Sequence, residues 1–578
     1  MNQSKKIYIH KPSKIFIILS ILIFFVWLNY LPINWRPIDD HMPLRSLLSG
    51  KISLIEQYRH LFYWFKGSYP PIWHFWAFTS YSLKDFGMDL TRYVLVVQGY
   101  ISILISALLM SSLCQFLFLE NYKLNNSINN KILRISSDCL SIIIIGFNPQ
   151  IVIHSSTYMP YNLGFITTTY SLLFIYSVFK NKIIKDNEIN NYFSIPNLYA
   201  FLIFLITLTF IFQSLFVIIP TILITLFIKN KLNLKLTFIE LKQAYLKIFE
   251  KKFFKKNLFF NISFISFVIL ILAGYLRKLL ILFLGNTAPG NWAFGINSVY
   301  KIKDLNLSSY IKKLPFNVIN IIGQSIYPFK YQQYNFALFF TLVLILVIFL
   351  FLREKKFKFA FSFFFSIYSI AVIFATFTNL NFSPTRHNIY LLPFSIFFII
   401  LFLVYFFIKA KSNYFLKNTF LHILTLVLIF NFYCLGFTKS LSKINYPKDL
   451  RLEAVKMAKD SDYYLDLDYI NENNTTGYFQ SHGNQENNAL RNKLCTKSRL
   501  EKNKNKSFKL FLYSSEEPID FDNPNILDFY IKNSRGCLNI NSSLKIVRKI
   551  EYENHHGFEQ NLNIKSHGHL YAYLVLVK

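Results

Sequence analysis

Long apolar runs recur along this chain, and they constrain its fold more than any other feature. The first run covers residues 15–31 and follows four lysines. A membrane-spanning helix needs roughly 20 mostly apolar residues, with about 17 as the lower limit. No small-residue cleavage site follows this first run, so we interpret it as an uncleaved anchor helix rather than a signal peptide.

The runs together predict a polytopic α-helical membrane protein with about 11 transmembrane helices. A hydrophobic content of 53% and a mean hydropathy of +0.33 agree with this class. The expected spans are residues 15–31, 92–119, 137–153, 161–179, 197–212, 214–228, 259–284, 335–352, 359–378, 389–408 and 416–436. The two short runs around Gln213 are interpreted as a tight hairpin, because a single span there would move every later loop to the other side.

The basic residues are concentrated in short loops between the apolar runs. The chain has 62 Lys and Arg against 30 Asp and Glu. Residues 1–438 hold 41 basic and 13 acidic side chains, whereas residues 439–578 hold 21 and 17. Loops rich in Lys and Arg stay on the cytoplasmic side of a membrane. This distribution argues against a nucleic-acid partner and predicts a multi-pass protein of the plasma (bacterial inner) membrane with a cytoplasmic N-terminus.

Residues 439–578 are expected to form an extracytoplasmic (periplasmic) domain that follows the membrane domain of residues 1–438. Runs at 508–515, 544–552 and 569–577 predict strands, and residues 447–459 predict an amphipathic helix. A small soluble α/β or α+β domain follows from this pattern. Cys495 and Cys537 lie in it, and either a disulfide between them or two free thiols would fit the sequence.

The first outer loop carries a concentration of polar residues directly after the first span. Asp39, Asp40 and His41 come first, and residues 44–65 have the apolar spacing of a helix that lies along the membrane interface. Pro70 and Pro71 then break the chain before a second interfacial segment that contains His74. The aromatic residues around His74 fit an interfacial belt better than a sugar-binding platform.

Two pairs of cationic residues are expected at the outer ends of later spans. Arg386 and His387 precede Pro393 where the tenth span begins, and Arg277 and Lys278 lie near the outer end of the seventh. Both pairs could reach a lipid phosphate, but both could also anchor a helix at the interface. Anchoring is the better interpretation for Arg277 and Lys278.

This arrangement resembles the GT-C superfamily of membrane glycosyltransferases that use polyprenyl-phosphate sugars. Protein O-mannosyltransferases and the aminoarabinose transferases of lipid A belong to it. The resemblance implies that Asp39 is the catalytic acid and Asp40 its neighbour, with Pro70 and Pro71 as the Pro-Pro turn and Arg386, His387 and Pro393 as a late motif. The chain departs from the family pattern in having Asp rather than Glu at position 40 and Tyr at position 69.

The chemistry of glycosyl transfer fits these residue types. A carboxylate can take the proton from an acceptor hydroxyl, and an arginine can hold the phosphate that leaves. We therefore predict transfer of a sugar from a polyprenyl-phosphate carrier to an extracytoplasmic lipid, glycan or protein. No cofactor is required, and a divalent cation beside the acidic pair would be possible without any sequence support.

Other functions remain open at this stage. A membrane transporter or lipid-linked glycan flippase would place ionisable residues within its spans, and these spans are nearly free of charge. A non-catalytic assembly protein would depend on its C-terminal domain rather than on Asp39. The aspartate pair alone would also fit a solvated turn.

Overall fold

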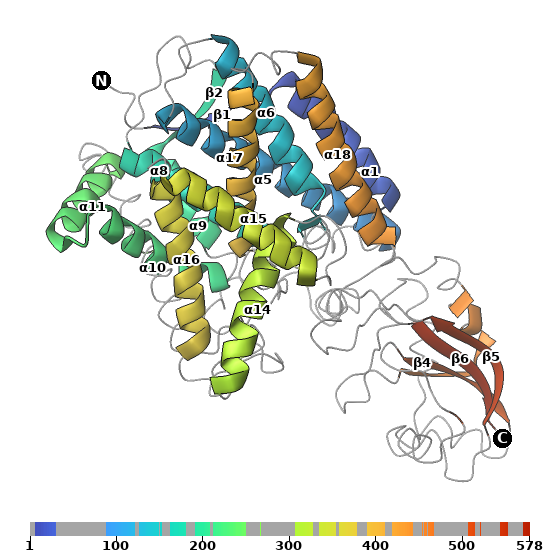
Figure 1. The fold of residues 1–578 in the computed structure, drawn as a ribbon. Helices are drawn as coiled ribbons and strands as arrows, with labels where there is room; N and C mark the ends of the chain where they lie inside the picture. The colour runs from blue at the N-terminus through green and yellow to red at the C-terminus, as the bar shows by residue number, and fades with distance from the viewer. Residues whose placement is uncertain are drawn as a thin grey trace. The chain divides into compact units, whose positions relative to one another are not determined.

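The computed structural model describes a helical region and a C-terminal sheet (Figure 1). It describes residues 6–30, 88–121, 127–148, 151–152, 162–180, 191–208, 212–249, 266, 307–326, 334–353, 358–377, 390–410, 419–442, 453–454, 456–458, 460–466, 507–514, 521, 544–552 and 570–577. Within these residues the chain is mostly helical. The labelled helices are α1 (Lys14–Tyr30), α5 (Met88–Asn121), α6 (Ser127–Gly146), α8 (Asn162–Lys180), α9 (Asn197–Leu208), α10 (Phe212–Lys229), α11 (Leu234–Ile248), α14 (Leu307–Ile326), α15 (Tyr334–Arg353), α16 (Lys358–Phe377), α17 (Leu392–Ala410) and α18 (Thr419–Ser442).

Every expected span that falls within the described residues coincides with a helix. The span at 259–284 lies outside them apart from Ser266. By length and composition, two helices of the described part could cross a membrane, Val96–Leu119 within α5 and Lys358–Phe377. The number of membrane crossings therefore stays a prediction, while the helical class of this region is established.

Two helices occupy segments that were expected only to be loops. α11 lies in the Lys-rich loop after the sixth span, and α14 lies in the outer loop before the eighth. The Asn233 side chain accepts a hydrogen bond from the Leu236 N–H and so caps the start of α11. α6 also begins at Ser127, well before residue 137, where the expected span begins. The expectation missed this part because the first turns carry polar residues and lie outside the apolar run.

The start of α9 and the end of α10 are both held by α11. Lys229 at the end of α10 lies 2.6 Å from Glu240 of α11, and Asn197 at the start of α9 donates to the Lys247 carbonyl at 3.4 Å. Glu240 and Lys247 are about 10 Å apart along α11, whereas one straight helix from Asn197 to Lys229 would be about 48 Å long. The start of α9 and the end of α10 therefore lie at the same end of the helical unit.

A two-stranded ribbon joins further segments at this end. β1 (Lys6–His10) pairs antiparallel with β2 (Tyr192–Pro196), from Lys6 opposite Pro196 to His10 opposite Tyr192. Arg134 in α6 donates to the Lys11 carbonyl at 3.0 Å, which ties the start of that helix to the ribbon. The Lys247 ammonium donates to the Val178 carbonyl at 2.9 Å, which ties α11 to the end of α8.

The beginning of α16 and the end of α17 also lie at this end. The ring of Phe359, in the first turn of α16, is 6.3 Å from that of Tyr176 near the end of α8. The ring of Tyr405, near the end of α17, is 6.5 Å from that of Phe118 near the end of α5. We call this end of the helical unit, where the described segments next to the basic loops meet, the basic end.

The last turns of three helices meet at the opposite end of the helical unit, which we call the far end. Trp27 of α1 donates to the Gly146 carbonyl of α6 at 2.7 Å, and Phe147 lies 5.4 Å from Phe437 of α18. A Cβ at Gly146 would lie 3.2 Å from Ile23, so glycine allows α1 to approach α6 this closely. α1, α6 and α18 therefore run in the same direction, from the basic end to the far end.

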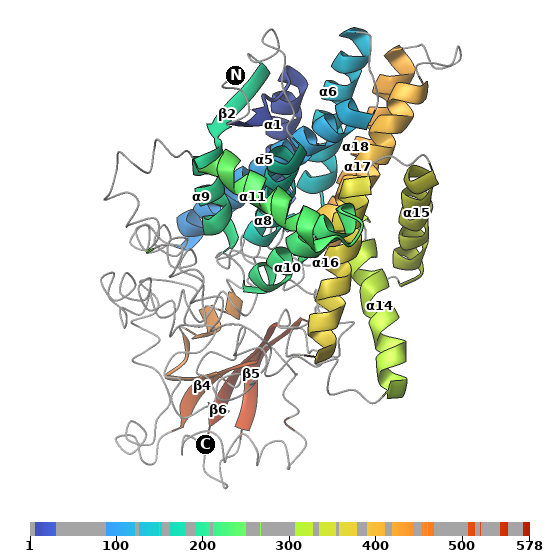
Figure 2. The ribbon, with the colours of Figure 1, turned by 90° about the vertical axis from the view of Figure 1, so that its left-hand side faces the viewer.

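The C-terminal strands form one mixed sheet in the order β3-β4-β6-β5 (Figure 2). β3 (Tyr463–Asp466) is parallel to β4 (Phe508–Ser514), and β6 (Leu570–Val577) is antiparallel to β4 and to β5 (Leu544–Tyr552). One face is a core of buried side chains that includes Leu510, Leu512, Tyr573 and Val575. The expected strands at 508–515, 544–552 and 569–577 are confirmed within one residue.

The chain divides into two compact units. The helical unit comprises residues 1–29, 58–75 and 96–439, and the second unit comprises residues 30–57, 76–95 and 440–578, which include the sheet. The single domain boundary expected at residue 439 stays a prediction.

Candidate functional site

A buried polar cluster lies near the basic end, where the N-terminal segment meets α5 and α6. Asp138 of α6 is fully buried, and it is the only acidic residue that is buried within the described part of the chain. Its Oδ1 accepts a hydrogen bond from the Ser111 hydroxyl at 2.6 Å, and its Oδ2 accepts one from the Ser13 N–H at 2.8 Å. Both carboxylate oxygens are therefore used to hold other segments.

Ser13 connects this cluster to the first helix. It precedes Lys14, and its hydroxyl accepts a hydrogen bond from the Phe16 N–H at 3.3 Å, which makes it the N-cap of α1. Because Asp138 holds the Ser13 N–H, the start of α1 is fixed against α6. A negative charge at a helix N-terminus is also favoured by the helix dipole.

His10 lies beside the same cluster at the end of β1. The backbone N–H of His10 donates to the Ser112 hydroxyl at 3.0 Å, and the ring Nδ1 lies 2.6 Å from the Lys11 carbonyl. Burial, together with the positive charge of Arg134, lowers the pKa of His10 from 6.5 to about 4. The imidazole is therefore neutral at physiological pH, with its Nδ1–H donated to the carbonyl.

These contacts indicate a structural role for the Asp138 cluster. A catalytic carboxylate must be able to reach the substrate, whereas Asp138 is fully buried and its two oxygens accept hydrogen bonds from the protein. The cluster joins the N-terminal ribbon to two helices, and hydrogen bonds to a charged group contribute about 1.5–3 kcal/mol each.

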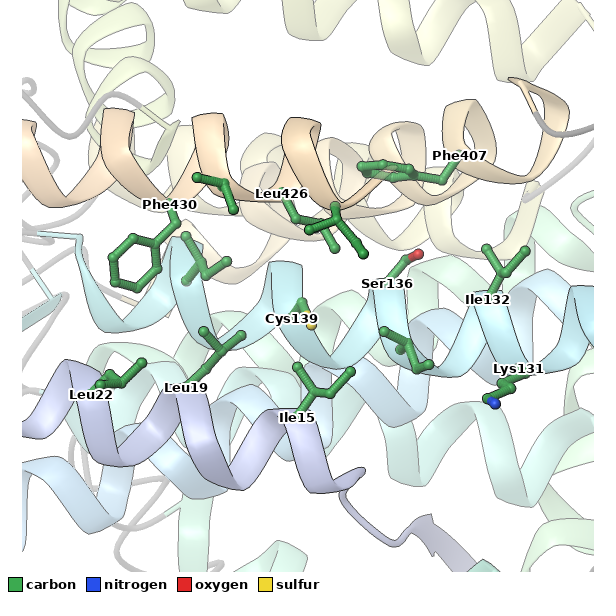
Figure 3. A pocket seen from close by; sticks show the side chains of 14 residues that line it. Ile15, Leu19, Leu22, Lys131, Ile132, Ser136, Cys139, Phe407, Leu426 and Phe430 are labelled. Atoms are coloured by element: carbon green, nitrogen blue, oxygen red, sulfur yellow. The ribbon is translucent and has the colours of Figure 1, made fainter. Parts of the chain in front are cut away.

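An apolar cavity of about 700 Å³ lies between α1, α6, α17 and α18 (Figure 3). Figure 3 shows Ile15, Leu19 and Leu22 on one wall and Leu426 and Phe430 on the other. Lys131 is the only charged residue among the described residues that line it. A cavity of this size and composition can accept a hydrocarbon chain.

A group of hydroxyls surrounds the start of α17. Tyr390 is fully buried, and its hydroxyl has no hydrogen-bond partner among the described residues. The Tyr368 hydroxyl lies 3.4 Å from the Leu391 carbonyl and 3.5 Å from the Ser395 hydroxyl. An unpartnered buried hydroxyl costs about 1–3 kcal/mol, so Tyr390 is a polar group available to a ligand or water.

The residues predicted from the sequence to form the site all lie outside the described residues, so their arrangement stays a prediction. They are Asp39, Asp40, His41, Pro70, Pro71, His74, Arg277, Lys278, Arg386 and His387. Among the residues that the structure describes, no group of three or more His, Cys, Asp or Glu side chains is arranged to hold a metal ion.

Comparison of the chain with protein-family models, curated proteins and solved structures finds no match. The assignment of a function therefore depends on the residues and on the described geometry.

Asp138, His10 and Tyr390 are not among the residues predicted from the sequence. An acidic residue in an apolar run is unusual, and this signal could have identified Asp138. His10 and Tyr390 give no comparable signal, because only the fold reveals their burial.

Proposed function

We propose that the protein is an integral membrane glycosyltransferase of the GT-C type. It transfers a sugar from a polyprenyl-phosphate carrier in the outer leaflet to an extracytoplasmic acceptor. Asp39 is the general base, and Arg386 binds the phosphate of the donor. The observation that carries the proposal is that α1 ends, and α17 begins, at the end of the helical unit opposite the basic end.

The gathering of the basic segments supports the proposed orientation. The N-terminal ribbon, the start of α6 and α11 contact one another or shared partners at the basic end. The positive-inside rule assigns that end to the cytoplasm. A chain that crosses a bilayer repeatedly is expected to collect its basic loops in this way.

Exposed apolar faces support membrane insertion. α15 alone exposes Phe339, Leu342, Ile345, Leu346 and Phe349, each by more than half of its surface. Such a continuous apolar stripe is unfavourable in water but is normal for a helix in contact with lipid tails.

The far end then faces the outer leaflet, where the proposed site belongs. α1 ends at Tyr30 near this end, and about nine residues separate it from Asp39, a segment that can span up to ~30 Å. α17 runs in the opposite direction, so it begins near the far end, and only about four residues separate Arg386 from Tyr390, or up to ~14 Å. The proposal takes these two short segments to converge on one shared site.

The proposed mechanism uses one residue on each side of the reacting bond. Asp39 removes the proton from the acceptor hydroxyl as that oxygen attacks the anomeric carbon. The bond from the anomeric carbon to the phosphate oxygen breaks, and Arg386 and His387 stabilise the negative charge on the departing polyprenyl phosphate. The buried hydroxyl of Tyr390, next to this segment, can donate to or accept from the polar part of a bound ligand.

The buried Asp138 is the one observation that favours a transporter, the alternative function. An ionisable residue inside a membrane bundle often marks an ion pathway. Both oxygens of Asp138 are engaged with backbone and serine donors, and a structural role explains them fully. Glycosyl transfer therefore remains the proposed function.

The test measures sugar transfer by the purified full-length protein. The donors are a panel of labelled polyprenyl-phosphate sugars, and the readout is labelled product together with released polyprenyl phosphate. General base catalysis contributes typically ~10²–10⁴-fold, so Asp39→Asn should lower kcat at least ~100-fold while expression and thermal stability are retained. Arg386→Gln should also impair transfer.

Asp460→Asn serves as the matched control, because Asp460 is half exposed and pairs only weakly with Arg548 at 3.6 Å. This variant should keep full activity. Wild-type activity in Asp39→Asn would rule out Asp39 as the base. Transport of a lipid-linked sugar between two compartments, with no product formed by the wild type, would favour the flippase instead.

A further inference from the structure

The apolar cavity between α1, α6, α17 and α18 has a direction relative to the helical unit. Figure 3 shows Lys131, Ile132 and Phe407 toward one end and Leu22 and Phe430 toward the other. The first group belongs to the start of α6 and the end of α17, which lie at the basic end. The cavity therefore begins near the basic end and extends toward the middle of the helical unit.

The cavity is open along its side and apolar along its length. Ile15, Leu22, Ile423 and Val427 all line it and are each 41–55% exposed. Along α6 its lining extends from Lys131 to Ile143, which corresponds to about 18 Å. One leaflet of a bilayer is half of a hydrocarbon core of roughly 30 Å. The cavity thus matches the depth of one leaflet, as a groove for a single lipid tail would.

The charge at the mouth of the cavity identifies the kind of lipid. Lys131 is exposed and has no ion-pair partner among the residues that the structure describes. Arg134, one turn further along α6, adds a second positive charge near this end. A lipid phosphate at this position would neutralise a cation that the described part of the protein leaves unpaired.

We infer that this cavity is a binding groove for an anionic phospholipid of the cytoplasmic leaflet. One acyl chain lies between α1 and α18 against α6, and the phosphate lies beside Lys131. A polyprenyl-phosphate donor fits less well, because its phosphate would have to lie at the far end, where Arg386 is proposed to bind it. The inference rests on the membrane orientation of the proposed function but not on glycosyl transfer itself.

The test uses the purified full-length protein and a phosphatidylglycerol that carries a photoreactive diazirine in its acyl chain. Phosphatidylcholine with the same chain is the neutral comparison. After irradiation, mass spectrometry identifies the labelled peptides. We expect phosphatidylglycerol to label residues 15–22 and 423–430 more strongly than phosphatidylcholine does.

Two pairs of variants test separately the charge of Lys131 and the free volume of the cavity. Lys131→Gln should lower phosphatidylglycerol labelling about fivefold, which corresponds to ~1 kcal/mol for one interfacial cation. Lys235→Gln, at an exposed position of α11, is the control and should have no effect. Leu19→Trp fills the cavity and should remove labelling of both segments, whereas Ile345→Trp on the exposed face of α15 should not.

Equal labelling by the two lipids in the wild type, or unchanged labelling in Lys131→Gln, would overturn the inference. Replacement of lipid labelling by cross-links between two copies of the chain, or recovery of a polyprenyl lipid from the groove, would also overturn it. Asp39→Asn should label like the wild type, so a failure of the proposed glycosyl transfer can be recognised separately from a failure of lipid binding.

Discussion

Individual polar residues fix the start of the helical unit more firmly than its apolar packing alone would. Asp138 holds Ser13 and Ser111 at once, and Gln115 donates to the Ser111 hydroxyl at 3.0 Å. Each of these groups would be costly to bury without a partner. Burial of the Asp138 carboxyl group is therefore tolerated because it accepts hydrogen bonds from two other segments.

Replacement of Asp138 should test this role directly. Asp138→Ala leaves the Ser13 N–H and the Ser111 hydroxyl without their acceptor, and we expect a loss of about 2–4 kcal/mol in the free energy of unfolding in detergent. Asp138→Asn keeps one acceptor oxygen and should lose less. The exposed control Asp460→Asn should change stability by less than about 0.5 kcal/mol. Equal stability of Asp138→Ala and the wild type would contradict the structural role.

His10 should make stability depend on pH. The pKa of His10 is about 4 in the folded protein, against 6.5 when the residue is exposed. Its contribution is therefore fully present above pH 6.5 and is lost as the pH falls toward 4, because the unfolded chain binds a proton that the folded protein excludes. The loss is up to ~3 kcal/mol.

The measurement compares thermal unfolding of the wild type and His10→Gln between pH 8 and pH 4. Other groups titrate in both proteins, so the relevant quantity is the difference between the two curves. We expect the wild type to lose its advantage over His10→Gln below pH 6.5. A constant difference between the two proteins across this range would show that burial does not lower the pKa of His10.

At the scale of elements, the contacts of α11 hold the start of α9 and the end of α10 at the same end of the helical unit. Lys229 and Asn230 from the end of α10 both reach Glu240 of α11, at 2.6 and 3.0 Å. A carboxylate that accepts two hydrogen bonds fixes α11 against α10. This contact and the one from Asn197 to Lys247 keep the two helix ends near each other, as the predicted hairpin requires.

Exchange of the charged pair tests this arrangement. Glu240→Lys alone places like charges together and should destabilise the helical unit by about 1–3 kcal/mol. The double variant Lys229→Glu with Glu240→Lys should recover a measurable part of that loss, as judged by thermal unfolding in detergent. The absence of any recovery would mean that the two residues do not interact and would weaken the case for the hairpin.

The local pattern predicts some elements and misses others for physical reasons. The strands β4, β5 and β6 are visible as short runs rich in aromatic and branched residues, and the apolar helices are visible by length. The pairing of β1 with β2 is not visible, because the two strands are far apart in the sequence and each is only five residues long. The amphipathic helices α11 and α14 are missed because a search for continuous apolar runs passes over them.

At the scale of the whole molecule, the sequence predicts the charge asymmetry and the structure supplies its geometry. The loops rich in Lys are recognisable in the sequence, but only the contacts among β1, α6, α8 and α11 bring their borders together. The candidate site itself was predicted from residue types and a family resemblance. The burial of Tyr390, which follows Arg386 closely in the sequence, could not be predicted, because it depends on how α16 and α17 pack.

The central claim is that Asp39 and Arg386 share one site on the outer face. The most direct measurement places cysteines at both positions, in a protein whose Cys495 and Cys537 are replaced by serine, and labels intact cells with a membrane-impermeant maleimide. We expect both cysteines to react from outside, and a short bifunctional maleimide to cross-link residues 39 and 386 within one chain. Reaction of either cysteine only after the membrane is permeabilised would contradict the claim, as would the complete absence of this cross-link.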